Sequence, residues 1–185
     1  EGRQGEQKLI RMNEWGGTGI IGRLHTPELV EVAARAKVPQ VLVDPEERRL
    51  PKGHPIHRHS VVRSDTAAVG RLAAAYFLER RFIHYAYVGE VQGFMWSARR
   101  GEAFARAVRG AGFECRIYGA LTTAEQEDAG LERPRLCAWL NALPKPVALL
   151  AAMDNRGRQV MDACAWAGLN VPRDIAVLGV DNDDD

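Results

Sequence analysis

Residues 147–182 read VALLAAMDNRGRQVMDACAWAGLNVPRDIAVLGVDN, and they contain the clearest indication of the fold class in the sequence. Two short apolar runs, 147–152 and 175–180, enclose a segment in which apolar side chains recur at helical spacing. Continuous apolar runs are typical of strands in a sheet covered on both faces, and a strand–helix–strand unit joins parallel strands. Asp154 and Asp181 each follow a strand, so we expect both at the carboxyl edge of one parallel sheet, where such sheets bind ligands.

The rest of the chain repeats this alternation, which predicts an α/β protein with parallel sheets. Further strands are expected at residues 19–24, 40–43, 60–63, 83–88 and 113–118. Helices are expected from the cap Thr26, from Ser64-Asp65, from the cap Ser97 and over 134–143, with a polar loop over 119–132. In the second of these helices the predicted buried stripe is Val69, Leu72, Ala73, Tyr76 and Phe77.

The predicted domain boundary falls after residue 64. The strand at 60–63 ends where the helix at Ser64-Asp65 would cross over, so residues 1–64 are expected in an N-terminal lobe and 65–185 in a C-terminal lobe. The chain begins with Glu1 and stops just after a strand, and we therefore expect it to be a fragment of a longer protein.

Composition narrows the class of protein. Apolar residues make up 46% and charged residues 26%, as in ordinary soluble domains, and the net charge of +1 favours neither nucleic acid nor a membrane surface. No apolar run approaches the ~18 residues of a membrane-spanning helix. Cys115, Cys137 and Cys164 are odd in number and lack metal-ligand spacing, which predicts reduced thiols in a cytoplasmic protein.

Five candidate ligand-binding residues lie at or just after strand ends: Trp96, Arg100, Asp154, Asp181 and Asn182. Such a set suits a neutral polyol, because carboxylates accept from hydroxyl pairs, a guanidinium donates to oxygens and an indole covers a C–H face. Three of them have a simpler alternative: Asp154 as a helix N-cap, Asp181 as a solvated chain end, and Trp96 as a core residue. Arg100, expected in the first turn of its helix, would oppose the helix dipole, which favours a ligand role.

Other chemistry finds little support in the sequence. His54, His57 and His59 are close together, but a solvated loop explains them better than a metal site because they lack helical spacing and nearby cysteines. No G-x-S-x-G or P-loop motif occurs, and no nucleophile is paired with a base. The glycine-rich segment Gly16-Gly17-Thr18-Gly19 precedes its predicted strand instead of following it, which is the wrong side for a phosphate-binding loop. We therefore predict no catalytic residues, no cofactor and no metal.

Two segments carry a family resemblance. LAAMDNRG at 150–157 and GLNVPRDIAVLGVDN at 168–182 resemble the sugar-binding effector domain of lac-repressor-type (LacI/GalR) regulators. Residues 19–21 and 64–70, and Arg100 followed four residues later by an aromatic, agree with it. Within that group, Trp96, the Met-Asp-Asn-Arg form and the Asp-Asn ending resemble bacterial xylose operon regulators.

The resemblance implies a two-lobed periplasmic-binding-protein-like (type I) fold, present here in part, with the ligand in a cleft between lobes. By motif match, Arg100, Asp154 and Asp181 fall on positions that hold sugar hydroxyls, and Trp96 on one that stacks on the ring. Two residues depart from the family pattern: Ala103 stands where most members have glycine, and Met153 where an asparagine usually precedes the aspartate.

The function expected from this resemblance is that of the effector domain of a bacterial transcriptional regulator. Xylose or a related neutral aldopentose would control binding to operator DNA by cleft closure, in a cytoplasmic homodimer whose DNA-binding domain lies outside this chain. No membrane contact is expected. The alternative is a periplasmic sugar-binding protein of a transport system, which would require a signal sequence in the full gene.

Overall fold

The computed structural model describes residues 17–24, 27–45 and 52–183. The chain divides into two compact units, Glu1–Ser64 and Asp65–Asp185. The expected helix cap Thr26 lies outside the described residues. No helix in the described part of the chain is both long and apolar enough to cross a membrane.

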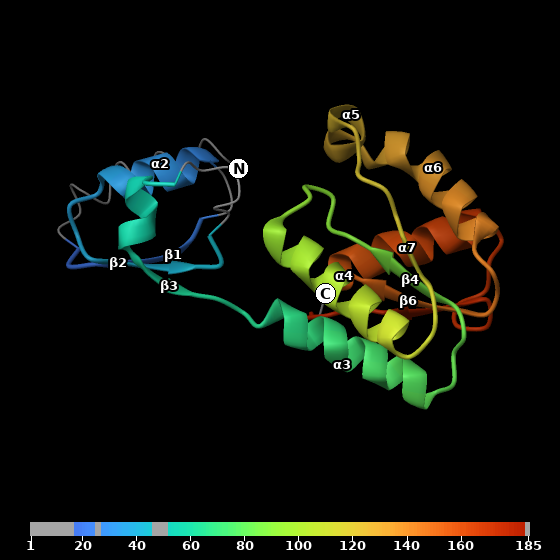
Figure 1. Ribbon diagram of the computed structural model, residues 1–185. Helices are drawn as coiled ribbons and strands as arrows, with labels where there is room; N and C mark the ends of the chain where they lie inside the picture. Colours follow the sequence, from blue (N-terminus) through green and yellow to red (C-terminus); the bar gives the residue numbers. More distant parts are fainter. Residues whose placement is uncertain (1–16, 25–26, 46–51, 184–185) are drawn as a thin grey trace. The chain divides into compact units, whose positions relative to one another are not determined.

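The first unit contains a three-stranded parallel sheet of order β1-β2-β3 (Figure 1). The elements are β1 Ile20–Arg23, α2 Pro27–Arg35, β2 Gln40–Val43, the 3₁₀ turn η1 Pro55–Arg58 and β3 Ser60–Val62. Helix α2 covers one face of the sheet and packs on it through a small core of Leu24, Val30, Ala33, Leu42 and Ile56. Asp44, directly after β2, accepts both the amide and the hydroxyl of Ser64 at 2.9 Å, which ties the end of this unit to its sheet.

The second unit contains a four-stranded parallel sheet of order β5-β4-β6-β7. Its strands are β4 Tyr85–Val88, β5 Cys115–Ile117, β6 Val147–Ala151 and β7 Ile175–Leu178. Its helices are α3 Thr66–Glu79, α4 Met95–Gly110, α5 Thr123–Glu127, α6 Ala129–Ala142 and α7 Asp154–Trp166. The α/β class with parallel sheets predicted from the sequence is confirmed.

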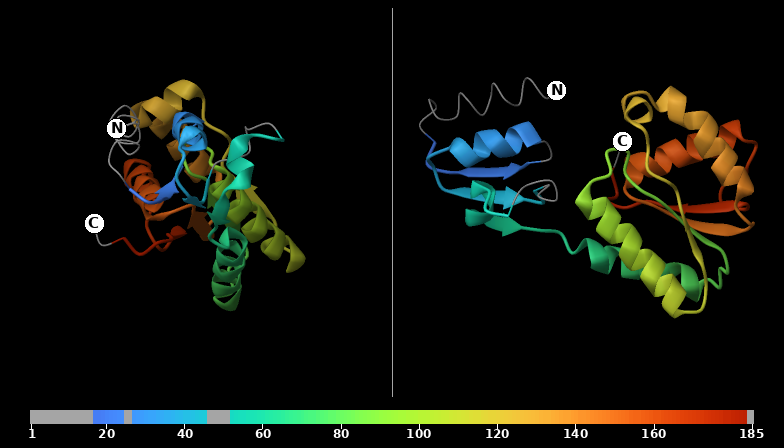
Figure 2. Two further views of the ribbon diagram at one scale, coloured as in Figure 1. Left: turned by 90° about the vertical axis from the view of Figure 1, so that its left-hand side faces the viewer. Right: turned by 45° about the horizontal axis from the view of Figure 1, so that its top comes forward.

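Side chains of the central strands alternate between two cores. Tyr85 and Tyr87 of β4 face the layer of α3 and α4, together with Phe77 and Phe104. Ala86 and Val88 face the layer of α6 and α7. All residues of β4 and β6 are buried, as a sheet covered on both faces requires, and Figure 2 shows the two helical layers flanking the sheet.

The predicted polar loop over 119–132 is wrong in part, because two helices begin within it. Thr122 and Glu125 form a reciprocal capping box at the start of α5. Asp128 caps α6 by accepting the amide of Gly130 at 2.7 Å, so that helix begins five residues before Pro134. Pro134 therefore lies inside α6, where it has no N–H to donate to the carbonyl oxygen of Gly130 four residues earlier.

The predicted buried stripe of α3 is also wrong in part. Leu72 is 70% exposed and Tyr76 43% exposed. The buried face instead carries small residues together with one aromatic: Thr66, Gly70, Ala73, Ala74 and Phe77. A Cβ at Gly70 would overlap the carbonyl oxygen of Arg100 and lie 2.9 Å from the amide nitrogen of Phe104, so glycine lets the α3 and α4 backbones approach.

Ala103 completes this close contact between α3 and α4. Its Cβ would lie 3.2 Å from a Cβ placed at Gly70. Ala103, at the position where most of the resembled family has glycine, thus lies directly against Gly70 of α3.

Lowering the pH below 4 should reduce the stability that Asp174, in the turn before β7, contributes to the fold. The amide and side chain of Asn170 and the guanidinium of Arg173 bond its carboxylate and lower its pKa from 3.8 to about 2. The carboxylate form is thus favoured in the folded state, so its contribution is complete above pH 4 and is lost as the pH falls to about 2. Thermal unfolding of the parent and Asp174→Asn between pH 5 and 2 should show the parent losing more stability. Parallel curves would contradict this.

Candidate functional site

The candidate site lies at the carboxyl edge of the four-stranded sheet. Strands β4, β6 and β7 are parallel neighbours, with Val88 paired to Ala151 and Leu150 to Leu178. The segments that follow these strands therefore emerge at one edge. They are the β4–α4 loop, the start of α7 and the turn after β7, and they carry or lead to all five predicted residues.

Helix α4 begins earlier than the sequence suggested. Its N-cap is Phe94, which makes no side-chain capping bond, so the prediction that Ser97 caps the helix is wrong. The Ser97 hydroxyl instead accepts the amide of Glu90 at 2.9 Å and lies 3.0 Å from the Tyr87 hydroxyl. This bond closes the β4–α4 loop onto the helix it leads into. Because α4 begins at Met95, Arg100 lies in its second turn and not in its first.

Arg100 is 5% exposed and lies against the end of β6. Its Nη1 donates to the carbonyl oxygen of Ala152. The guanidinium carbon lies 5.1 Å from the centroid of the Trp96 ring, which itself stacks on Phe94 with centroids 6.2 Å apart. Trp96 is half-buried and packs partly on the core beneath α3 and α4, so it contributes both to packing and to the surroundings of Arg100.

Asp154 ties the start of α7 to the turn after β7. It is the first residue of the helix and not its N-cap, which is Met153. Its amide donates to the carbonyl oxygen of Val180 at 2.9 Å, and its carboxylate accepts the amide of Asp183 at 2.9 Å. A Cβ at Gly179 would overlap the Asp154 carboxylate, so a larger residue there would force that side chain out of its present position.

Asp181 and Asn182 are exposed residues in the turn that Asp154 holds. Their φ angles are 104° and 57°, in the left-handed region that non-glycine residues rarely adopt. Such backbone costs of order 1–3 kcal/mol per residue and is concentrated at functional sites. Asp154 forms one hydrogen bond with Val180, before these two residues, and one with Asp183, after them, and together the two bonds hold the turn in that conformation.

The predicted residues thus form two linked groups. Trp96 and Arg100 form one, and Asp154 with the turn of Asp181 and Asn182 forms the other. The short segment Ala152–Asp154 joins them, because Arg100 bonds its first residue and the turn bonds its last. A buried guanidinium and a carboxylate at one sheet edge provide a donor and an acceptor for hydroxyl groups.

Sequence reasoning missed a buried ion pair next to this site. Arg156 and Glu132 have side chains only 2% and 4% exposed, and both oxygens of Glu132 accept from the guanidinium. The Met-Asp-Asn-Arg segment contains this arginine, but nothing in its spacing indicated burial. Arg156 follows Asp154 and Asn155 and precedes Gly157, so no apolar pattern indicated that its side chain would be buried.

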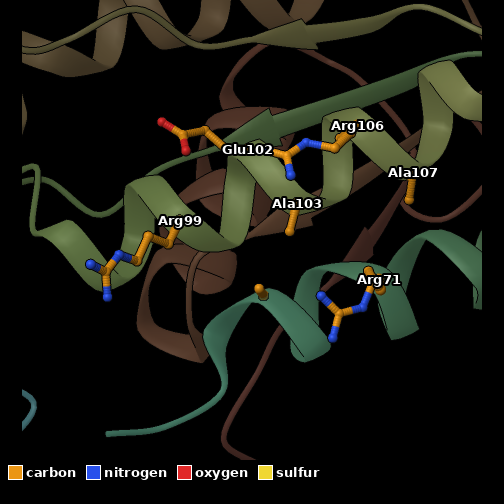
Figure 3. Close-up of a pocket in the computed structure, with 7 residues that line it drawn as sticks. Arg71, Arg99, Glu102, Ala103, Arg106 and Ala107 are labelled. Carbon is orange, nitrogen blue, oxygen red and sulfur yellow. The ribbon is translucent and has the colours of Figure 1, made fainter.

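A groove of about 280 Å³ between α3 and α4 contains none of the five predicted residues. Figure 3 shows Ala103 and Ala107 pointing from α4 toward α3. Three guanidinium groups and one carboxylate also line it, from Arg71, Arg99, Arg106 and Glu102. The Nη2 atom of Arg71 lies 3.8 Å from a carboxylate oxygen of Asp65.

The side chain of His54 takes part in local structure. His54 Nδ1 accepts the amide of Ile56 at 3.3 Å, and its Nε2 lies 3.0 Å from Glu31. Across the described ranges, no three metal-ligating side chains come together. All three cysteines are free, and Cys164 is buried.

Comparison with known proteins identifies the family. The model of the periplasmic binding protein-like domain matches residues 74–185, more than half of the chain. The chain belongs to this family. The match covers nearly all of the four-stranded unit, including the candidate site.

Relatives confirm the resemblance to xylose operon regulators. The xylose operon regulatory protein of Escherichia coli (strain K12) is 25% identical over 179 residues, covering 96% of this chain and 45% of that protein. The same-named protein of Haemophilus influenzae is 24% identical over 176 residues, covering 94% and 44%. The periplasmic binding protein-like chain thus spans less than half the length of these relatives.

Solved structures share the fold. A structure of a xylose-binding transcription activator superposes with a TM-score of 0.76 at 24% identity, covering 97% of this chain and 50% of that one. A putative ribose operon repressor from Burkholderia thailandensis gives 0.74 at 23% identity, covering 99% and 65%. A solute-binding protein of an ABC transporter from Burkholderia multivorans gives 0.70 at 19%, covering 97% and 63%. Regulators and transport proteins therefore share this architecture.

Proposed function

We propose that this periplasmic binding protein-like chain is the sugar-binding effector domain of a bacterial transcriptional regulator. The observation that carries the proposal is the site geometry: buried Arg100 beside Trp96, and Asp154 holding the turn of Asp181 and Asn182, at one sheet edge. The similarity to proteins named as xylose operon regulators supports a regulator over a transport protein. The whole protein would act in the cytoplasm as a homodimer, with operator DNA bound by a segment outside these 185 residues.

The proposed ligand is a neutral aldopentose, with xylose as the first candidate. One guanidinium against two carboxylates gives the five-residue set a formal charge near −1, so a sugar phosphate would meet uncompensated negative charge. In this proposal, Arg100 donates to a ring or hydroxyl oxygen, Asp154 and Asp181 accept from hydroxyls, and Asn182 adds an amide. The Trp96 indole covers the C–H face of the ring.

The proposed regulation is a population shift. A sugar that binds one conformation of the effector domain better than another changes the equilibrium that the DNA-binding segment senses. No group of residues in this set combines a nucleophile with a base, and the proposed outcome of binding is therefore release or recruitment of DNA, not turnover of the sugar.

Titration calorimetry of the intact protein with xylose, arabinose, ribose, glucose and glucose 6-phosphate tests this proposal. We expect a free pentose, with xylose first, to bind most tightly and the phosphate to bind at least about ten-fold more weakly. Tighter binding of glucose 6-phosphate than of every free pentose would contradict the neutral-sugar assignment.

A further inference from the structure

Arg156 connects three elements beside the candidate site. It lies in the first turn of α7, two residues after Asp154. Its Nη1 donates to Glu132 of α6 at 2.9 Å and to Gln159 at 2.6 Å, and its Nη2 donates to the other oxygen of Glu132. Its Nε donates to the carbonyl oxygen of Gly89, directly after β4, at 2.9 Å.

Stability alone does not explain this buried pair. Removing two charges from water costs several kcal/mol per ion, and well-packed apolar residues of similar volume often stabilise a core equally well or better. An apolar pair would not supply the directional hydrogen bond from Arg156 to Gly89. The carboxylate of Glu132, by accepting from both terminal nitrogens, fixes the plane of the guanidinium and therefore the direction in which Nε points.

The peptide bond between Gly89 and Glu90 is held from both sides. Arg156 of α7 donates to its carbonyl oxygen, and Ser97 of α4 accepts from its amide nitrogen, each at 2.9 Å. One peptide plane, which is rigid because of its partial double bond, thus joins the two helices that carry the candidate site residues. Helix α4 carries Trp96 and Arg100, and α7 begins at Asp154.

We infer that Arg156 is a positioning residue for the sugar site, which sets Trp96 and Arg100 relative to Asp154 through the Gly89–Glu90 peptide. This inference rests on the proposed function. Arg156 itself does not contact the sugar. Glu132 orients the guanidinium of Arg156, and the Ser97 hydroxyl accepts from the amide nitrogen of the same peptide.

The test is the double variant Glu132→Leu/Arg156→Met in the intact protein, in which apolar side chains replace both charges. We expect it to fold cooperatively, because neither charge is left buried alone. Amides of residues 90–94 should exchange with deuterium about ten-fold faster or more, and the affinity for xylose should fall by a similar factor. Arg156→Lys keeps the positive charge beside Glu132 but lacks the guanidinium Nε. It should also show faster exchange of residues 90–94 and weaker xylose binding, although it introduces no apolar side chain into the core.

The matched control is Arg135→Met, which breaks the ion pair between Arg135, whose side chain is 38% exposed, and Glu125. It should leave both the exchange of residues 90–94 and the sugar affinity unchanged. A parent protein that binds no sugar would refute the proposed function, while the exchange of residues 90–94 would still decide whether Arg156 orders the loop. Unchanged exchange in a folded variant, or faster exchange with unchanged sugar affinity, would overturn the positioning role.

Discussion

Asp154→Ala is expected to weaken xylose binding by the intact protein by about ten- to hundred-fold. The substitution removes a carboxylate that is proposed to accept from sugar hydroxyls. It also removes the acceptor of the Asp183 amide, which helps to hold Asp181 and Asn182 in their left-handed conformation. Titration calorimetry measures the change directly, and thermal unfolding of the same sample shows whether the fold is retained.

Two further variants make the Asp154 experiment specific. Asp162→Ala removes an equal charge from an exposed position on the same helix and should bind xylose like the parent. Asp154→Asn keeps an oxygen that can accept the Asp183 amide but loses the charge, so its affinity should lie between those of the parent and Asp154→Ala. Equal affinities of Asp154→Ala and Asp162→Ala would show that Asp154 does not contact the sugar.

Gly70→Val is expected to lower the free energy of unfolding by about 3 kcal/mol. Any Cβ at this position overlaps the carbonyl oxygen of Arg100 and crowds Phe104, and both are backbone contacts that cannot rotate away. Relief requires α3 and α4 to separate, which also shifts the helix that carries Arg100. Urea-induced unfolding of the parent and the variant measures the loss.

Leu72→Ala is the control for the same helix. Leu72 is larger than Gly70 and more apolar, yet it is 70% exposed, so its truncation should change stability by no more than about 0.5 kcal/mol. A Gly70→Val variant as stable as the parent would mean that α3 and α4 do not approach as closely as described.

The layers of the fold were predictable because buried strands and helices have distinct apolar periods. The runs at 147–152 and 175–180 became β6 and β7, joined by α7. The stripe of α3 was predicted correctly only at Ala73 and Phe77, since a helix packed closely on another helix buries glycine and alanine and leaves Leu72 and Tyr76 exposed. A prediction from hydrophobicity would instead bury the leucine and the tyrosine and leave the glycine exposed.

The location of the candidate site could be predicted, because residues that follow parallel strands meet at one edge of the sheet. Arg100 and Asp154 lie near the expected edge, linked through Ala152–Asp154. The role of Ser97 was not predictable, because a serine near a helix start ordinarily suggests a cap, whereas this one holds the amide of Glu90. Arg156 was missed for a related reason: its burial depends on Glu132, 24 residues earlier in the chain, and not on its neighbours in sequence.

A crystal structure of the intact protein with bound xylose would show whether the candidate site residues hold the sugar. We expect sugar oxygens within hydrogen-bonding distance of the Arg100 guanidinium and the Asp154 carboxylate, with the Trp96 ring against the sugar. A xylose bound elsewhere, for example in the groove between α3 and α4, without contact to either Arg100 or Asp154, would contradict it.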